Sequence, residues 1–247
     1  MDSKRLCDIL NNIAPFSTSC EWDNCGAILD CGNNFDRVLF ALDATADSIA
    51  LAQQLKCGAI VSHHPAIFGQ GLKKITSKDV VAIAAMKQIS LFAVHTCWDA
   101  ANGGVNDVLC QKLGILDVQK LDLGRIGTLN MKNAAMLAEH VKKTINARCV
   151  TFVDGKKPIT KVAVIGGAGG DYIETALLAG CDALVTGEIK HHEMLLARQL
   201  GITVICAGHF ATEVISIEAL RRAVQHKAED ELECILFGDE PDPICVI

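Results

Sequence analysis

Histidines and acidic residues occur at spacings that suit metal chemistry. They form three short motifs: the adjacent pair His63 and His64, and two His-x3-acid pairs, His95 with Asp99 and His209 with Glu213. Imidazole plus carboxylate is a ligand set for borderline divalent metals such as Zn, Mn, Fe, Co or Ni. Two such ions would push a bridging water towards hydroxide and polarise a substrate oxygen. The residue types therefore predict a two-metal, hydrolase-like centre.

The adjacent histidines come directly after an apolar run at residues 59–62, and Pro65 follows them. Neighbouring side chains on an extended chain point to opposite sides. We therefore expect His63 and His64 to fit poorly as ligands of one ion and better as ligands of one ion each. The alternative is that both are ordinary hydrogen-bonded polar residues at the end of a strand.

The two His-x3-acid pairs share a structural setting. Each histidine follows an apolar run, and a spacing of four brings both side chains together if that stretch is helical. Glu213 at the first turn of a helix could simply complement the helix dipole. That alternative does not explain a histidine four residues earlier in both halves of the chain.

Apolar runs of strand length alternate with segments of helical period, which predicts an α/β fold. Strands are expected at residues 38–43, 59–62, 91–95, 148–153, 161–166, 183–186, 202–206 and 233–237. Helices are expected to begin near Ser3, Thr45, Lys78, Gly104, Lys132, Asp171, Lys190 and Thr212. Parallel α/β sheets bind ligands beyond the carboxyl ends of their strands, where the histidine motifs are expected.

The two halves of the 247-residue chain resemble one another. Residues 38–65 align with residues 162–189 at a shift of 124, without a gap, and eight of the 28 positions are identical. A shift of 114 then places the first His-x3-acid pair on the second. Chance similarity between two βαβ units is the alternative. We expect two pseudo-symmetric, interlinked α/β lobes, residues 1–122 and 123–247, with the dinuclear site between them. The last strand could instead return to the first lobe.

Composition excludes several classes of protein. A net charge of −6 and an aromatic content of 4% do not favour binding to nucleic acid or to an anionic membrane. The first 16 residues do not resemble a signal peptide, and no apolar run approaches the roughly 18–20 residues that span a bilayer.

The twelve cysteines include no CxxC pair, and Cys57, Cys149, Cys181 and Cys206 lie in apolar stretches. Reduced, buried thiols and a cytoplasmic location are expected.

Several segments together resemble a known family. They are EWDNCG (21–26), SHHPAIF (62–68), HTCWDAANGGVND (95–107), TGEIKHHEML (186–195) and GHFATE (208–213). Their order and nearly whole-chain coverage are similar to those of the Nif-three-like dinuclear metal-centre proteins, which are often called GTP cyclohydrolase 1 type 2 homologues.

The resemblance implies which residues bind metal. It carries over five ligands of two divalent ions per chain: His63, His64, Asp99, His209 and Glu213. His95 is a weaker ligand candidate, and a role in handling protons is as strongly implied for this residue. No organic cofactor is implied. The resemblance also implies a homohexamer whose metal sites face an internal cavity.

The chain departs from the family pattern at two points. Cys97 and Trp98 stand where Asn and a small apolar residue are common, and we expect this to alter the pocket wall. The long middle insertion of some relatives is also missing. Three further features stay open. Residues 166–170 form either a phosphate-binding loop or a tight turn, and Glu188, His191 and His192 either line the pocket or begin a solvated helix. Residues 22–24 either form the edge of the pocket or only pack against the rest of the protein.

The expected function is that of a metal-dependent hydrolase. The resemblance points to attack of water on the purine ring of GTP with release of formate, with His95 as the catalytic residue. The alternatives are a non-enzymatic protein that binds or delivers metal, a regulatory scaffold, and a metal-dependent phosphoesterase. The mixed His and carboxylate set favours catalysis, because such sites can keep open coordination positions.

Overall fold

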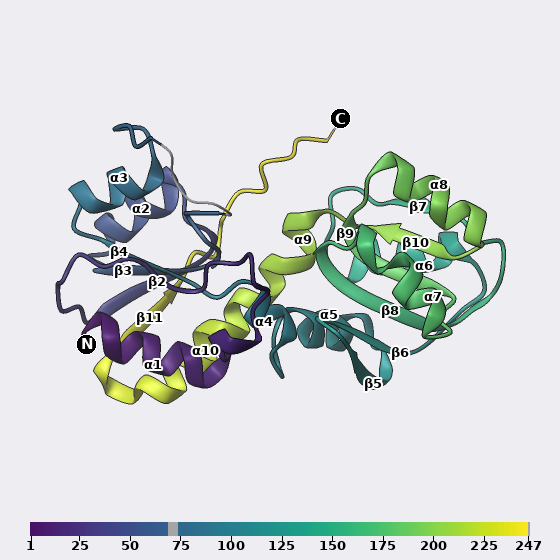
Figure 1. Ribbon diagram of the computed structural model, residues 1–247, viewed down its shortest axis with the longest axis horizontal. Helices are drawn as coiled ribbons and strands as arrows, with labels where there is room; N and C mark the ends of the chain where they lie inside the picture. The colour runs from purple at the N-terminus through teal and green to yellow at the C-terminus, as the bar shows by residue number, and fades with distance from the viewer. Residues whose placement is uncertain (69–73, 247) are drawn as a thin grey trace. The chain divides into compact units, whose positions relative to one another are not determined.

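Two β-sheets organise the chain, and the computed structural model describes residues 1–68 and 74–246. Each sheet belongs to one of two units (Figure 1). The first unit comprises residues 1–104 and 217–241, and the second comprises residues 105–216 and 242–247. The α/β class predicted from the sequence is confirmed, because both sheets carry helices.

The sheet of the first unit has five strands. Their order is β1 (Gly26–Leu29), β4 (Ser90–Ala93), β3 (Ala59–His64), β2 (Arg37–Asp43) and β11 (Glu233–Leu236), and only β1 is antiparallel to its neighbour. Figure 1 shows α2 (Ala46–Gln54) and α3 (Val80–Met86) on one face, and α1 (Ser3–Ile13) and α10 (Ile217–Ala228) on the other. Helices on both faces explain why β2 and β3 are buried almost throughout, with apolar residues along most of β2 and the first half of β3. A short helix, α4 (Thr96–Ala100), follows β4.

The sheet of the second unit has six strands. Their order is β5 (Leu116–Leu121), β6 (Gly124–Met131), β8 (Ile159–Ala168), β9 (Ala183–Glu188), β10 (Thr203–Cys206) and β7 (Thr151–Val153), with β8, β9 and β10 parallel. Alternate residues of β8 pack on opposite faces of the sheet. Val162 and Val164 pack with α5 (Val105–Leu113) and α6 (Ala134–Thr144), whereas Ala163 and Ile165 pack with α7 (Ile173–Leu178) and α8 (His191–Leu200). A short helix, α9 (His209–Glu213), follows β10.

Short 3-10 turns complete the helical segments. They lie at Phe16–Thr18, Gly170–Tyr172, Val214–Ser216 and Glu229–Glu231. The turn Gly170–Tyr172 leads directly into α7, and Val214–Ser216 joins α9 to α10. The helix expected to begin near Thr212 is therefore interrupted and begins as α10 at Ile217.

The internal repeat is present in the pairing of the strands. Val38 pairs with Ala59 in the first sheet, and Val162 pairs with Ala183 in the second, so both pairs are related by the shift of 124. Each third parallel strand also has an antiparallel neighbour, β1 beside β4 and β7 beside β10. The same register in both sheets shows that the sequence similarity reflects a repeated local structure.

The second copy of the repeat has one extra residue before its histidine. Ala59 pairs with Ser90 and Ala183 pairs with Thr203, so β4 and β10 are related by a shift of 113, while the two histidines are related by a shift of 114. The additional length lies between β10 and His209. There the chain passes through Gly208 at φ 93°, a conformation that favours glycine.

The boundary between the units differs from the predicted lobes. The chain leaves the first unit after Gly104 instead of at residue 122, because α5 packs on β8 and β5 pairs with β6. The last strand returns to the first sheet, as the alternative allowed: β11 pairs in parallel with β2. This pairing covers the edge that β2 would otherwise present.

The twelve cysteines are free thiols with different degrees of burial. The buried ones are Cys57, Cys97, Cys110, Cys181 and Cys234. They behave as the small hydrophobes that the sequence predicted. Cys149 and Cys245 are exposed, which differs from the expectation for Cys149 because its flanking strand, β7, is itself largely exposed. Within residues 1–68 and 74–246, no helix has the length and apolar character needed to cross a membrane.

Candidate metal centre

His63 lies at the penultimate position of β3 and is fully buried. Its Nδ1 is 2.9 Å from the carbonyl oxygen of Val94, the residue that follows β4. A carbonyl oxygen only accepts hydrogen bonds, so Nδ1 must donate. The lone pair of the neutral ring therefore resides on Nε2, which is the nitrogen that can bind a metal.

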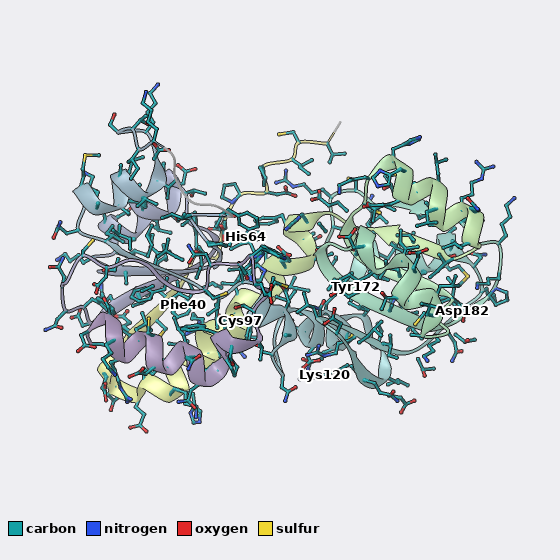
Figure 2. All side chains as sticks on the ribbon, in the orientation of Figure 1. Phe40, His64, Cys97, Lys120, Tyr172 and Asp182 are labelled. Atoms are coloured by element: carbon teal, nitrogen blue, oxygen red, sulfur yellow. The ribbon has the colours of Figure 1, made fainter. Side chains whose placement is uncertain are left out.

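His64, the last residue of β3 and labelled in Figure 2, is held in the same way by the strand on the other side of β3. Its Nδ1 is 2.8 Å from Oδ1 of Asp43, which ends the neighbouring strand β2. The carboxylate of Glu240 accepts hydrogen bonds from the backbone N–H groups of Leu42 and Asp43 at 2.6 and 2.9 Å, which anchors the end of β2. The lone pair of His64 therefore also resides on Nε2.

His95 caps the N-terminus of α4 and is oriented by Asp23. Its Nδ1 is 2.8 Å from Oδ1 of Asp23, while the second carboxylate oxygen accepts from the backbone N–H and the hydroxyl of Thr96 at 3.0 and 2.6 Å. Burial by itself would raise the pKa of the Asp23 carboxyl. The hydrogen bonds from His95 and Thr96 outweigh burial and hold that pKa well below its usual range. Asp23 is therefore an anion that keeps the Nδ1 proton of His95 in place.

The three imidazoles of the first unit converge. Their ring centroids are 4.9 Å apart for His63 and His64, 5.1 Å for His63 and His95, and 5.4 Å for His64 and His95. Their ligand atoms all lie within 4.8 Å of one another, so this set could hold a metal ion. The expectation that His63 and His64 bind one ion each stays a prediction, and their hydrogen bonds to different neighbouring strands turn both rings towards His95.

Asp99 adds a carboxylate to this set. It lies in α4, is 8% exposed, and places Oδ1 3.8 Å from Nε2 of His63. That separation is too long for a hydrogen bond. It falls within the roughly 4.2 Å that can separate two ligand atoms each about 2.1 Å from one ion. The geometry of His63 and Asp99 therefore fits a shared metal ion.

The second unit contains the other predicted pair. His209 opens α9 and Glu213 ends it, and Nε2 of His209 lies 3.1 Å from Oε2 of the buried Glu213. Nδ1 of His209 is 3.0 Å from Oε1 of Glu188, the last residue of β9. The helical spacing of four therefore brings the imidazole and the carboxylate together, as the sequence predicted.

The glycine-rich loop at residues 166–170 has a role that the sequence did not reveal. Gly167 has φ 65°, and a Cβ atom at this position would lie 2.2 Å from Oε1 of Glu213 and 3.1 Å from Nε2 of His209. The loop therefore packs directly against the His209–Glu213 pair. Glycine leaves the space that these two side chains occupy.

The structure settles several smaller expectations. Glu188 contacts His209, whereas His191 and His192 lie exposed at the start of α8. Cys97 is 0% exposed and Trp98 is 2% exposed, so neither side chain forms the wall of an open pocket, contrary to expectation. The indole of Trp98 packs in the core.

The residues that orient the histidines were the ones that the sequence left unassigned. All four imidazoles, of His63, His64, His95 and His209, donate from Nδ1 to a carbonyl or carboxylate oxygen. Such hydrogen bonds set the tautomer and the orientation of histidines that bind metal. A signal existed for Asp43 and Glu188, because each ends a parallel strand. Asp23 lies 72 positions from His95, and its signal was its place in the family motif EWDNCG (21–26).

Comparison with known proteins agrees with the motifs. The family model described as Duf34/NIF3 (NGG1p interacting factor 3) matches residues 1–243. A protein of Clostridium acetobutylicum named GTP cyclohydrolase 1 type 2 homolog is 29% identical over 260 residues, covering 97% of each chain. A Lactococcus lactis protein of the same name is 33% identical over 214 residues, covering 79% of this chain and 81% of its own.

A solved structure extends the comparison to the fold. The crystal structure of a Bacillus cereus protein related to NIF3 matches with a TM-score of 0.91 at 21% identity, covering 100% of this chain and 99% of that one. At this identity the likeness concerns the fold alone. Together with the family model that spans residues 1–243, it leads to one conclusion: the chain belongs to the Duf34/NIF3 (NGG1p interacting factor 3) family.

Proposed function

We propose that this protein is a dinuclear metal-dependent hydrolase that acts on the purine ring of GTP. The observation that carries the proposal is the uniform orientation of four imidazoles, each held by a hydrogen bond at Nδ1, which leaves Nε2 as the nitrogen that can bind a metal. Carboxylates beside two of them, Asp99 and Glu213, complete a mixed donor set. The names of the relatives supply the reaction class.

The proposed ligands of two divalent ions are His63, His64, Asp99, His209 and Glu213. The first three come from one unit and the last two from the other. Neither set alone offers enough donors for two ions, since even a single zinc ion takes about four ligands. We therefore propose that the ligands of both units are needed to bind the two ions.

Bound divalent ions would supply the Lewis acidity that activates water near neutral pH and polarises a substrate oxygen. The protein's own contribution is to position and to move protons. Asp23 keeps Nδ1 of His95 protonated, so Nε2 is able to accept a proton from water and to pass it to the departing ring nitrogen. One water opens the five-membered ring at C8 to a formamide, and a second converts the formamide to formate and an amine.

Elemental analysis followed by incubation with GTP tests the proposal. Wild-type protein should carry two divalent ions per chain, and Asp99→Ala and His64→Ala should lose them. His226→Ala, at an exposed position of α10, is the matched control and should keep them. Formate release is then measured with each metal in turn. A wild-type protein that binds no metal contradicts the proposal, and one that binds two ions but consumes no GTP is a metal-binding or metal-delivery protein instead.

We also propose that the protein assembles as a homohexamer in the cytoplasm. The family resemblance supports the assembly, and the absence of paired cysteine motifs in the sequence supports a reducing compartment. Light scattering on the purified protein measures the assembly, and a mass of one or two chains would contradict it. Cell fractionation tests the location.

A further inference from the structure

Two large aromatic side chains remain exposed beside His95. Trp22 is 54% exposed and Phe68 is 58% exposed, and their ring centroids lie 5.5 Å apart. Both rings also contact the imidazole of His95, with centroid distances of 5.8 Å for Trp22 and 5.6 Å for Phe68. Exposed aromatic clusters of this kind mark binding sites more often than chance positions on a surface.

The segments that carry these rings are anchored by hydrogen bonds. On one side of Trp22, the backbone N–H of Cys20 donates to the hydroxyl of Thr96 at 2.9 Å, and on the other side Asp23 binds His95 and Thr96. The side-chain amide of Asn24 donates to the carbonyl oxygen of Ile67 at 3.1 Å, which ties this loop to the segment of Phe68. The backbone on both sides of Trp22 is therefore held while its indole stays open to solvent.

We propose that Trp22 and Phe68 form a stacking platform for the purine base of the substrate. An indole and a phenyl ring offer flat apolar faces, and because the two rings are inclined by 48°, a planar base stacks on one and contacts the other at an angle. Stacking of this kind tolerates any base. The platform therefore accepts nucleobases as a class and does not by itself distinguish guanine from adenine. With an aromatic content of only 4% in the chain, two rings suit one base and not a nucleic-acid strand.

The platform places the base where the proposed chemistry needs it. His95 contacts both rings edge-on, at interplanar angles of 70° and 63°. A base stacked on these rings lies beside the imidazole for which we propose proton transfer. The inference rests on the proposed function for the identity of the ligand, but its test needs no turnover.

Tryptophan fluorescence tests the platform directly, because the chain has one exposed and one buried tryptophan. Trp98 is 2% exposed, so the Trp98→Phe variant leaves Trp22 as the reporter, and the Trp22→Phe variant leaves only the buried ring. Guanosine and GTP should quench the emission of Trp98→Phe but not that of Trp22→Phe. Inorganic triphosphate, which has no base, should quench neither.

Calorimetric titration with guanosine measures the contribution of each ring. Trp22→Ala and Phe68→Ala should each weaken binding by about 5- to 100-fold, the range expected for loss of one stacked ring. Met86→Ala removes an apolar side chain that is 65% exposed elsewhere in the same unit, and it should bind guanosine like the wild type. Unchanged emission of Trp98 in Trp22→Ala verifies that the unit has folded.

The outcomes separate this inference from the proposed hydrolase. Guanosine binding that depends on Trp22, in a protein that releases no formate from GTP, supports the platform and contradicts the hydrolase. Formate release with the same KM in Trp22→Ala and in the wild type overturns the platform and leaves the hydrolase standing. Failure of both guanosine and GTP to quench Trp22 in the metal-loaded protein also overturns the platform.

Discussion

Nδ1 of His95 lies 2.8 Å from Oδ1 of Asp23, and the other oxygen of the same carboxylate binds Thr96. One buried anion therefore sets both the tautomer of the imidazole and the start of the helix that carries Asp99. The position of His95 depends on a loop distant in sequence, and the same loop presents Trp22. We propose that the orientation of His95, the transfer of protons by His95 and the binding of a base all depend on this loop.

Asp23→Asn should reduce metal binding by about 10- to 100-fold, a cost typical of losing a residue that supports a metal ligand, because Asp23 anchors the start of the helix that carries Asp99. The reason is that the amide carries no charge and has only one oxygen, so it cannot serve His95 and Thr96 together. Metal titration measures the affinity, and 15N shifts of the imidazole report whether Nδ1 keeps its proton. Asp8→Asn, at an exposed carboxylate paired with Lys4, is the control. Equal affinity and unchanged shifts in Asp23→Asn would contradict the role of Asp23.

Gly167→Ala should abolish metal binding by the His209–Glu213 pair, because the new methyl group would overlap Oε1 of Glu213. Gly180→Ala is a matched control: Gly180 has φ 76°, but a Cβ atom added there would meet no atom of the described residues within 4 Å. Both variants should lose roughly 1–2 kcal/mol of stability from the left-handed backbone. Only Gly167→Ala should also lose metal in elemental analysis, and retention of metal by this variant would show that the loop does not support the pair.

Glu218 should stabilise the protein at neutral pH but not in strong acid. Hydrogen bonds from Arg221 and Arg222 lower the pKa of Glu218 to about 2, and Arg221 also donates to the carbonyl oxygen of Cys234 in β11. A folded-state pKa below the unfolded value of 4.5 gives stability that is complete above 4.5 and is lost as the pH falls towards 2.

Comparison of Glu218→Gln with the wild type by urea unfolding measures this contribution. The difference should be roughly 1 kcal/mol at pH 7, as for partly exposed ion pairs, and should shrink towards zero near pH 2. Glu139→Gln, on an exposed pair with Lys143, should change stability less. A difference that stays constant across this range would show that charge on Glu218 is not the cause.

Cys25 and Cys97 should form a disulfide when the protein is treated with hydrogen peroxide. Their sulfur atoms are 3.4 Å apart, so they must approach by roughly 1.3 Å to reach bonding distance. Cys25 is partly exposed and Cys97, labelled in Figure 2, is fully buried, so peroxide should oxidise Cys25 first. Cys97 then displaces water, and one peroxide and two thiols yield one disulfide and two waters.

Peptide mapping without reduction should find a Cys25–Cys97 link that is lighter by two hydrogen atoms and that dithiothreitol reverses. Cys25→Ser should remove the link. Cys57→Ser, at a thiol whose pKa burial raises to about 11, should leave the link intact. Oxidation confined to the exposed Cys149 and Cys245 would contradict the prediction.

The local features of the fold and of the site could be predicted from the sequence. Apolar runs and their spacing located the parallel strands of both sheets, and the shift of 124 recurs in their pairing, because a strand covered on both faces carries apolar side chains along most of its length. The His-x3-acid spacing likewise predicted that His209 and Glu213 meet, since one helical turn brings them together. The strand β5 could not be found in this way because it is exposed and has no burial pattern, and β6 could not because its buried half consists of Gly124, Arg125, Ile126 and Gly127 and is not an apolar run.

The tertiary structure decided what links distant parts of the chain. The pairing of β11 with β2, the hydrogen bond between Asp23 and His95, and the close packing of Gly167 on Glu213 all join residues that lie far apart in the sequence. No local pattern encodes such contacts, because they depend on which strand ends become neighbours. The sequence alone determined which residues could bind metal, and the fold decided how each imidazole is held and which aromatic rings stand beside it.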